Sequence, residues 1–503
     1  MTRRAVADIC LILEGTYPYV AGGVSTWTHD LVKSQKHLTF HLVLLLPSGM
    51  DLTSRYTIPD NVTGVTRVFV QELPEGVGRS RWTDRLLDQI QVPLLSLQSQ
   101  GGLADVKRIL ELLGPHQEKL GRRILLNSKS AWTLLRRMYD SSLRGSSFLD
   151  YFWSWRSSLA GLYSVLLSDL PRAGLYHAVS TGYAGLYAAR ARLQTNRPVL
   201  LTEHGIYTNE RRIEIAMADW LYETPSEDLN AEETRRDLKS LWVDTFTSYS
   251  RACYAACTKI ITLYEGNQRL QVEDGADSAK LEIIPNGVDY DRFSQVQRDS
   301  PPRPPGVALI GRVVAIKDVK TFIRACAILR TRLPEVRVWV LGPTGEEEDY
   351  FQECLDLVGF LALEDTLTFT GKVRLEDYLG RIDVIALTSI SEAQPLVILE
   401  AGAAGIPTVA TDVGACREMI LGRSSESPAL GPGGAVTPLS NPGATAQALV
   451  RLLMDRNWYQ QCAGAIQSRV RRYYNKLDLD RTYRELYESC RMQPVVAQTE
   501  SDG

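Results

Sequence analysis

The chain has 503 residues, about three times the length of a typical single domain, so two or three hydrophobic cores are expected. Hydrophobic residues make up 44% of it and charged residues 23%, proportions that exclude disordered, coiled-coil and collagen-like chains. The formal net charge of −3 excludes a general basic field for a nucleic-acid backbone or an anionic membrane, so any anionic ligand must be held by a local site.

The first half of the chain alternates between strand and helix signals. Short apolar runs predict buried strands at about residues 9–13 and 42–46. A loop over 14–23 and a helix over 24–33 separate them. The segment from about 75–170 is rich in Leu and Arg and irregularly helical, which indicates a helical insertion. Further short strands are predicted at about 174–179, 198–202, 259–263 and 281–284.

A proline-rich segment at 300–306 separates the two halves of the chain. Its four prolines lack the N–H that a strand ladder needs, so we expect a linker there. Beyond it the alternation restarts, which is typical of a second parallel sheet covered by helices. Its strands are predicted at about 307–310, 336–341, 367–370, 384–387 and 408–410, with amphipathic helices over about 444–491.

These patterns predict an α/β protein with two Rossmann-like, doubly wound domains that face each other across a cleft. The first domain covers residues 1–300 and contains the helical insertion. The second covers 306–470. Residues 471–503 form a C-terminal helix and tail that could pack back on the first domain.

Cysteine usage and hydropathy predict a cytoplasmic protein. The eight cysteines are scattered, without a C-x-x-C pair or a Cys/His cluster of zinc spacing, and a reducing cytoplasm fits this pattern best. Asp8 and Glu14 interrupt the apolar N-terminal stretch before a signal-peptide core could form, and no later run reaches about 18 apolar residues. We therefore expect no transmembrane segment.

Open α/β sheets bind ligands at the carboxyl ends of their strands, so the loops there are the places to search. In the first half, the paired Gly22 and Gly23 would let a ligand approach the backbone at the start of a helix. His204 follows a predicted strand and could hydrogen-bond a sugar or acceptor hydroxyl. An ordinary tight turn and a structural histidine are the alternatives.

In the second half, Arg312 and Lys317 follow the first predicted strand and suit a diphosphate, as a planar fork and a point charge. Solvated surface charges are the alternative. Neither G-x-G-x-x-G nor a P-loop follows any predicted strand, which argues against a nicotinamide dehydrogenase and a P-loop NTPase. Phosphate binding would therefore use side chains and helix ends.

The segment 388–402 carries the most information. Pro395 favours the first position of a helix, so free N–H groups around it would face the cleft. Glu392 lies just outside this helix and Glu400 about one turn inside. Because a carboxylate accepts two O–H hydrogen bonds, Glu400 could hold a ribose diol and Glu392 the hydroxyls of a second sugar. The alternative, in which both acids only complement the helix dipole, fits poorly with Glu400 in an apolar run.

Several motifs cover both halves of the chain: Gly22-Gly23-Val24, Asn286-Gly287-Val288-Asp289, Gly311-Arg312, Lys317-Asp318, Leu341-Gly342-Pro343, Phe369-Thr370-Gly371 and the E-x7-E pair Glu392 and Glu400. Together they resemble the retaining glycosyltransferases of family GT4, which have the GT-B fold. The resemblance implies transfer of a sugar from a nucleotide diphosphate without a bound metal or other cofactor. It also implies attack on the face that the leaving phosphate departs from, with that phosphate helping to take the acceptor's proton.

The resemblance also implies the roles of individual residues. The catalytic residues would be Arg312, Lys317, Glu392 and His204. The substrate-binding residues would be Gly22, Gly23, Lys372, Val373, Gln394, Pro395, Leu396 and Glu400.

Two stretches, 13–19 and 202–211, resemble more narrowly the cytoplasmic transferase of the bacterial Pel exopolysaccharide system. This implies a UDP-sugar donor, either UDP-glucose or a UDP-N-acetylhexosamine, a polysaccharide acceptor, and membrane-embedded synthase partners that would hold the protein at the inner membrane. Many GT4 members have Glu-Gly-Phe-Gly where this chain has 392–395 as Glu-Ala-Gln-Pro, so the sugar does not transfer from the wider family. D-x-D strings at 289–291 and 478–480 are interpreted as capping or surface acids.

The sequence thus predicts a retaining, metal-independent hexosyltransferase. Two alternatives stay open. One is an inactive nucleotide-sugar-binding scaffold of a synthase complex, against which the intact Arg312, Lys317, Glu392 and Glu400 count. The other is a UDP-sugar epimerase or hydrolase of the same two-domain shape, which its product would distinguish.

Overall fold

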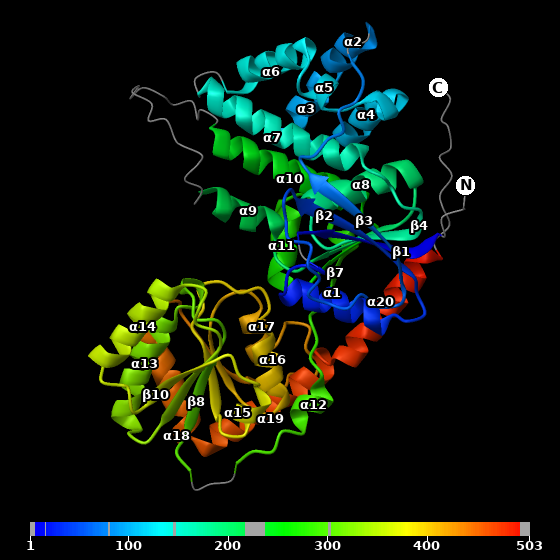
Figure 1. The fold of residues 1–503 in the computed structure, drawn as a ribbon. Helices are drawn as coiled ribbons and strands as arrows, with labels where there is room; N and C mark the ends of the chain where they lie inside the picture. The colour runs from blue at the N-terminus through cyan, green and yellow to red at the C-terminus, as the bar shows by residue number, and fades with distance from the viewer. Residues whose placement is uncertain are drawn as a thin grey trace. The chain divides into compact units, whose positions relative to one another are not determined.

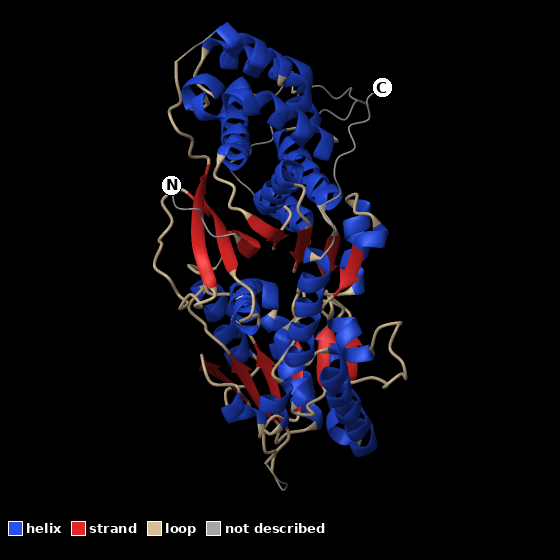
Figure 2. Ribbon diagram, turned by 90° about the vertical axis from the view of Figure 1, so that its right-hand side faces the viewer, coloured by secondary structure: helices blue, strands red, loops and turns tan. Residues whose placement is uncertain are grey.

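The computed structural model describes residues 6–15, 17–78, 81–143, 147–216, 237–299 and 303–492. The chain divides into two compact units, each built on one sheet (Figures 1 and 2). The first unit comprises Met1–Thr262, Asn267–Glu282 and Tyr483–Gly503, and the second comprises Leu263–Gly266 and Ile283–Thr482. The first three residues of the predicted linker and the chain's last residues lie outside the described part.

The first unit contains a seven-stranded sheet with the order β3-β2-β1-β4-β5-β6-β7. All described pairings from β3 through β6 are parallel. The order reverses between β1 and β4, so the topological switch point of this sheet lies there. Its strands are β1 (Ala7–Glu14), β2 (Phe40–Pro47), β3 (Val62–Val70), β4 (Ala173–Ala178), β5 (Val199–Glu203), β6 (Lys259–Thr262) and β7 (Leu281–Ile283).

Helices cover both faces of this sheet. Alternate side chains of a strand point to opposite faces, so Cys10 and Ile12 of β1 join the core beneath the helical insertion. On β4, His177 points to the other face, where it contacts Tyr487. The helices of this unit are α1 (Gly23–Ser34), α2 (Arg81–Gln89), α3 (Gln91–Leu97), α4 (Leu103–Leu113), α5 (Arg122–Leu125), α6 (Lys129–Ser142), α7 (Phe148–Leu167), α8 (Tyr183–Thr195), α9 (Tyr207–Ala216), α10 (Leu238–Ala256) and most of α11 (Glu265–Glu273).

The helical insertion, α2 to α7, shares its core with the sheet. Ile109 of α4 and Tyr151 of α7 are fully buried in the same apolar cluster as Ile12 of β1. The insertion therefore extends the core of the first unit (Figure 1).

The second unit contains a six-stranded parallel sheet with the order β10-β9-β8-β11-β12-β13 and its switch point between β8 and β11. Its strands are β8 (Gly306–Ile310), β9 (Arg337–Leu341), β10 (Leu367–Gly371), β11 (Val384–Leu387), β12 (Thr408–Thr411) and β13 (Gly434–Thr437). Its helices include α12 (Tyr290–Ser294), α13 (Val319–Arg332), α14 (Glu348–Phe360), α15 (Glu376–Leu379), α16 (Leu396–Ala403), α17 (Cys416–Leu421), α18 (Pro442–Met454) and α19 (Arg456–Tyr473).

Two strands were not predicted from the sequence. Both β3 and β13 lie at an edge of their sheet. In β3 only Val68 is buried, and the sequence VTGVTRVFV has no continuous apolar run that would predict a buried strand. In β13, Gly434 approaches β12 so closely that a Cβ would lie 1.9 Å from the Thr408 carbonyl oxygen.

The C-terminal helix α20 (Lys476–Arg491) is divided between the units, with the residues from Tyr483 onward in the first. Within the first unit, the Tyr487 hydroxyl lies 2.8 Å from Nδ1 of the buried His177. No helix among the described residues is long and apolar enough to cross a membrane. All eight cysteines are free and buried.

Candidate functional site

The second unit brings Lys317 and Glu392 together. Lys317 ends a short 3₁₀ turn after β8, and Glu392 lies on the loop after β11, the neighbouring strand across the switch point. Lys317 Nζ lies 2.5 Å from Glu392 Oε1, which also accepts a hydrogen bond from Ser389 Oγ at 2.6 Å. Both side chains are mostly buried, with 21% and 11% exposed. The other carboxylate oxygen of Glu392 accepts no hydrogen bond from the described residues.

Backbone contacts hold these two loops together. The Thr388 hydroxyl donates to the carbonyl of Asp318 at 2.9 Å, and the N–H of Ile390 donates to the carbonyl of Ile316 at the same distance. The loops after β8 and β11 therefore form one surface, with a cation and a carboxylate at its centre.

Arg312 lies at the edge of this surface and is half exposed. It forms an ion pair with Glu346 of the loop after β9, with 2.6 Å between Nη1 and Oε2. That loop approaches closely, because a Cβ on Gly342 would lie 2.0 Å from the Gly311 carbonyl oxygen. The sequence analysis assigned no role to Glu346, whose carboxylate pairs with the Arg312 guanidinium.

The segment before α16 is anchored by Gln394. Its side-chain Oε1 accepts from the N–H of Asn286 at 2.7 Å, and its Nε2 donates to the Asn286 carbonyl at 3.3 Å. The side chain predicted to bind substrate therefore clamps the loop around Asn286. Pro395 is the N-cap and not the first helical residue, because its ψ of 109° is extended, so the helix begins at Leu396. No side chain caps this helix, and Leu396 is exposed.

Glu400 lies on α16 and is half buried. No hydrogen bond from the described residues reaches its carboxylate. Burial raises its pKa, while the nearby charge of Arg292 acts in the opposite direction. An unsatisfied, partly desolvated carboxylate is suited to accept hydroxyl hydrogen bonds.

Lys372 and Val373 follow β10. Lys372 is exposed, and Val373 is half buried against an apolar core of the second unit. Among the described residues, no hydrogen bond or ion pair joins Lys372 to Lys317 or Glu392.

In the first unit, Gly22 is the N-cap of α1 and Gly23 its first residue. No side chain caps this helix, and a Cβ added at either glycine would meet nothing within 4 Å. The backbone is therefore open at this end of α1. Thr16 of the preceding loop lies outside the described residues.

His204 follows β5 and is 9% exposed. Its Nε2 is buried without a hydrogen-bond partner among the described residues, and its ring packs edge-on against Trp27 of α1, with 4.6 Å between ring centroids. Burial lowers its pKa to about 4, so the imidazole is neutral near pH 7. A neutral imidazole can either accept or donate one hydrogen bond to a hydroxyl.

The D-x-D acids have local partners. Asp289 accepts a hydrogen bond from the Arg292 N–H and caps α12, and Asp480 pairs with Lys476 on α20. Among the described residues, no group of three or more His, Cys, Asp or Glu side chains could hold a metal ion.

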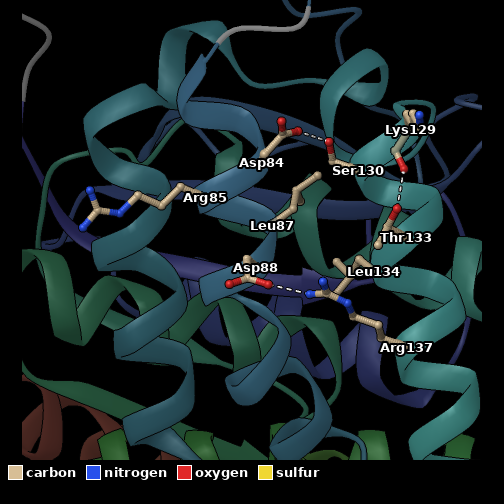
Figure 3. A pocket seen from close by; sticks show the side chains of 9 residues that line it. All are labelled: Asp84, Arg85, Leu87, Asp88, Lys129, Ser130, Thr133, Leu134 and Arg137. Atoms are coloured by element: carbon tan, nitrogen blue, oxygen red, sulfur yellow. Dashed lines mark hydrogen bonds and ion pairs between the residues drawn. The ribbon is translucent and has the colours of Figure 1, made fainter.

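A polar groove of about 510 Å³ lies between α2 and α6 of the helical insertion (Figure 3). Both of its acidic side chains have partners within the groove: Asp88 pairs with Arg137 at 2.5 Å, and Asp84 accepts a hydrogen bond from the Ser130 hydroxyl. These contacts join side chains of the groove to each other, and the side chains are exposed to solvent. We therefore assign the groove no role in the candidate site.

Two family models match the chain. The model described as a domain of unknown function, DUF3492, matches residues 7–279, and the model described as glycosyl transferases group 1 matches residues 304–455. A D-inositol 3-phosphate glycosyltransferase of Kineococcus radiotolerans is 32% identical over 197 residues, which cover 36% of this chain and 45% of the relative. The chain thus spans less than half the length of that relative.

Solved structures share the fold. HepE of Anabaena, solved in complex with UDP, has a TM-score of 0.58 at 15% identity and covers 96% of this chain and 100% of its own. A sucrose-phosphate synthase of Thermosynechococcus elongatus has a TM-score of 0.56 at 16% identity, covering 96% and 98%. The two Rossmann-like units are therefore those of the GT-B fold.

Proposed function

We propose that this chain, which belongs to the DUF3492 family and carries a group 1 glycosyl transferase domain, is a retaining, metal-independent glycosyltransferase that uses a UDP-sugar. The donor binds the second unit and the acceptor the first. The observation that supports this most directly is the surface formed by Arg312, Lys317 and Glu392 beside the uncapped end of α16.

This surface suits the chemistry of a leaving diphosphate. Arg312 and Lys317 supply positive charge where negative charge develops, and the N-terminus of α16 adds a partial positive charge. When the donor binds, its phosphates replace Glu346 and Glu392 as partners of the two cations. Glu392 is then free to accept hydroxyls of the hexose, and Glu400 those of the ribose.

The transfer step follows from these roles. The bond between the anomeric carbon and the diphosphate oxygen breaks, and the acceptor oxygen bonds to that carbon on the same face. The acceptor's proton passes to the departing phosphate, so UDP leaves with it. The protein contributes position and electrostatic stabilisation.

The narrower proposal is a PelF-type transferase that extends an exopolysaccharide from UDP-glucose or a UDP-N-acetylhexosamine. It rests on the resemblance of residues 13–19 and 202–211. In this proposal the protein works in the cytoplasm with membrane-embedded synthase subunits.

The test is incubation of the full chain with a panel of UDP-sugars and candidate saccharide acceptors. Released UDP and the glycoside product are both measured. UDP and glycoside in equal amounts are expected. UDP with free sugar would indicate a hydrolase, an altered UDP-sugar an epimerase, and UDP-sugar binding without turnover the scaffold alternative.

A further inference from the structure

Three loops of the first unit meet at the switch point of its sheet. They follow β1, β4 and β5, which are neighbours in the sheet. Strand β1 ends with Glu14 and β5 with Glu203, and the loop after β4 ends with Gly182 at the N-cap of α8. Sequence reasoning assigned these three residues no role.

The Glu203 carboxylate is 1% exposed and receives four hydrogen bonds. Their donors are Thr181 Oγ1 at 3.2 Å, the Tyr207 N–H at 3.1 Å, Tyr254 OH at 2.9 Å and Gln271 Nε2 at 2.9 Å. Burial nevertheless raises its pKa to about 7. Four donors on one carboxylate hold Glu203, and the residue that follows it, in one place.

Glu14 is the second anchored acid. It accepts hydrogen bonds from the Ala184 N–H at the start of α8, at 3.1 Å, and from the Tyr207 hydroxyl at 2.9 Å. Arg211 lies 4.0 Å away. Glu14 therefore ties the end of β1, just before the loop that leads to Gly22 and Gly23, to the start of α8.

Tyr207 joins the two acids. Its backbone N–H binds Glu203 and its hydroxyl binds Glu14. The side chain passes so close to Gly182 that a Cβ there would lie 2.4 Å from the hydroxyl oxygen. Any larger residue at 182 would displace the ring.

His204 lies between these anchors. It directly follows Glu203 and precedes Tyr207 by three residues, and no hydrogen bond from the part of the chain that the structure describes reaches its Nε2. Its ring also contacts Trp27, four residues after Gly23. The orientation of the imidazole thus depends on the same contacts that hold the three loops.

We propose that Tyr207 is a positioning residue, which through Glu14 and Glu203 holds His204 and the paired glycines in the arrangement that receives the acceptor hydroxyl. This rests on the proposed function. Tyr207 acts only through the other residues, so its effect falls on transfer and not on binding of UDP to the second unit.

The test uses the full chain labelled with ε1-¹³C-histidine, with the His204 resonance assigned from a His204→Gln variant. Tyr207→Phe removes only the hydroxyl that Glu14 accepts. Tyr163→Phe is the matched control, because the buried Tyr163 hydroxyl has no hydrogen-bond partner in the described structure. The experiment records the His204 resonance, UDP affinity by calorimetry, and transfer with the most active pair from the substrate panel.

In Tyr207→Phe we expect a shifted His204 resonance, unchanged UDP affinity and transfer reduced by about 10-fold to 100-fold, as for a displaced reacting group. Tyr163→Phe leaves all three unchanged. Gly182→Ala should reproduce the effect of Tyr207→Phe. If Tyr207→Phe does not fold, Glu14→Gln takes its place. The glutamine has one carbonyl oxygen where the glutamate has two carboxylate oxygens, so one of the two acceptors is lost.

An unmoved His204 resonance, or unchanged transfer, overturns the proposal. A loss of UDP affinity equal to the loss of transfer also overturns it, because that indicates a general structural defect. If the wild-type chain releases no UDP from any donor, the proposed function fails, and the resonance alone then decides whether Tyr207 positions His204.

Discussion

At the scale of single residues, the two proposed phosphate-binding cations have different surroundings. Arg312 pairs with a half-exposed acid, whereas Lys317 lies against a mostly buried one. Exposed ion pairs contribute little to the free energy of folding. A partly buried carboxylate that loses its paired cation, in contrast, destabilises the folded state. The two cations should therefore respond differently to substitution.

Arg312→Ala should change turnover without changing stability. Its pair with Glu346 is solvated, so the free energy of unfolding should change by no more than about 0.5 kcal/mol. Loss of one donor to the leaving diphosphate should lower kcat by about 10²-fold to 10³-fold. Denaturant unfolding and UDP release measure the two effects. A variant with wild-type turnover would remove this loop from the donor site.

Lys317→Met should affect both quantities. Of its contacts with described residues, Glu392 would keep only the hydrogen bond from Ser389, and we expect a loss of about 1–3 kcal/mol in the free energy of unfolding. Turnover should fall at least as far as in Arg312→Ala. The double variant Lys317→Met with Glu392→Gln should recover part of the stability but none of the activity. If Lys317→Met is as stable as the wild type, the pair does not contribute to the fold.

Glu400 and Glu392 should fail in different ways. Glu400→Ala should weaken UDP binding, because a ribose contact persists without the sugar and a hydrogen bond to a charged group contributes about 1.5–3 kcal/mol. Glu392→Ala should leave UDP affinity nearly intact yet reduce transfer. UDP affinity, measured by calorimetry, and the rate of transfer are compared for both variants. Equal losses of UDP affinity would contradict this division of roles.

At the scale of elements, the end of α20 packs into the first unit through buried polar groups. His177 on β4 lies 2.8 Å from the Tyr487 hydroxyl and 2.9 Å from the Thr202 hydroxyl, which Tyr483 also contacts. Burial, and to a lesser extent the charge of His204, lowers the pKa of His177 to about 3. The His177 imidazole is therefore neutral in the folded protein near pH 7.

This arrangement predicts a pH dependence of stability. Below its ordinary pKa of 6.5, His177 takes up a proton in the unfolded state but not in the folded state, so its contribution falls as the pH drops from 6.5 towards 3. Between pH 7 and pH 5 the loss is about 2 kcal/mol. The raised pKa of Glu203 acts in the opposite sense, since its contribution falls as the pH rises from 4.5 to about 7.

A comparison with variants isolates the histidine. His177→Gln should be less stable than the wild type at pH 7, and it should lose about 2 kcal/mol less between pH 7 and pH 5. Tyr163→Phe, which removes only a buried hydroxyl, is the control and should keep the wild-type slope. Denaturant unfolding at the two pH values measures the slopes. Identical slopes in all three proteins would mean that His177 titrates normally in the folded protein.

At the scale of the whole molecule, the candidate residues divide between the two units. The second holds the cations and both glutamates of the E-x7-E pair, and the first holds the paired glycines and His204. In the proposed reaction, Arg312, Lys317 and the start of α16 balance the diphosphate charge.

Chelation should therefore leave turnover unchanged. We expect the same rate of UDP release in EDTA as in magnesium or manganese, because positively charged side chains take the place of a divalent ion. The rate is measured on protein dialysed against EDTA. Loss of activity that magnesium or manganese restores would contradict metal independence and return attention to the D-x-D acids.

The sequence alone determined that the chain holds two parallel sheets and where their central strands lie. Continuous apolar runs predicted β8 and β11 within about one residue, because a parallel strand covered on both faces needs such a run. The carboxyl-end rule placed the loops of Lys317 and Glu392 at the same edge of the second sheet, whereas only the observed strand order makes β8 and β11 neighbours and brings the two loops together. The edge strands β3 and β13 could not be predicted, because neither is buried along its whole length and neither therefore needs a continuous apolar run.

The tertiary structure alone decided how individual side chains are used. Nothing local to Gln394 indicates that its amide clamps Asn286, 108 residues earlier in the chain. Likewise Glu14 and Tyr207 are 193 residues apart, and only the reversal of strand order between β1 and β4 brings the loop after β5 near enough to β1 for their hydrogen bond. Periodicity records which face of an element is buried, whereas the partner of a buried polar group depends on which strands the fold makes neighbours.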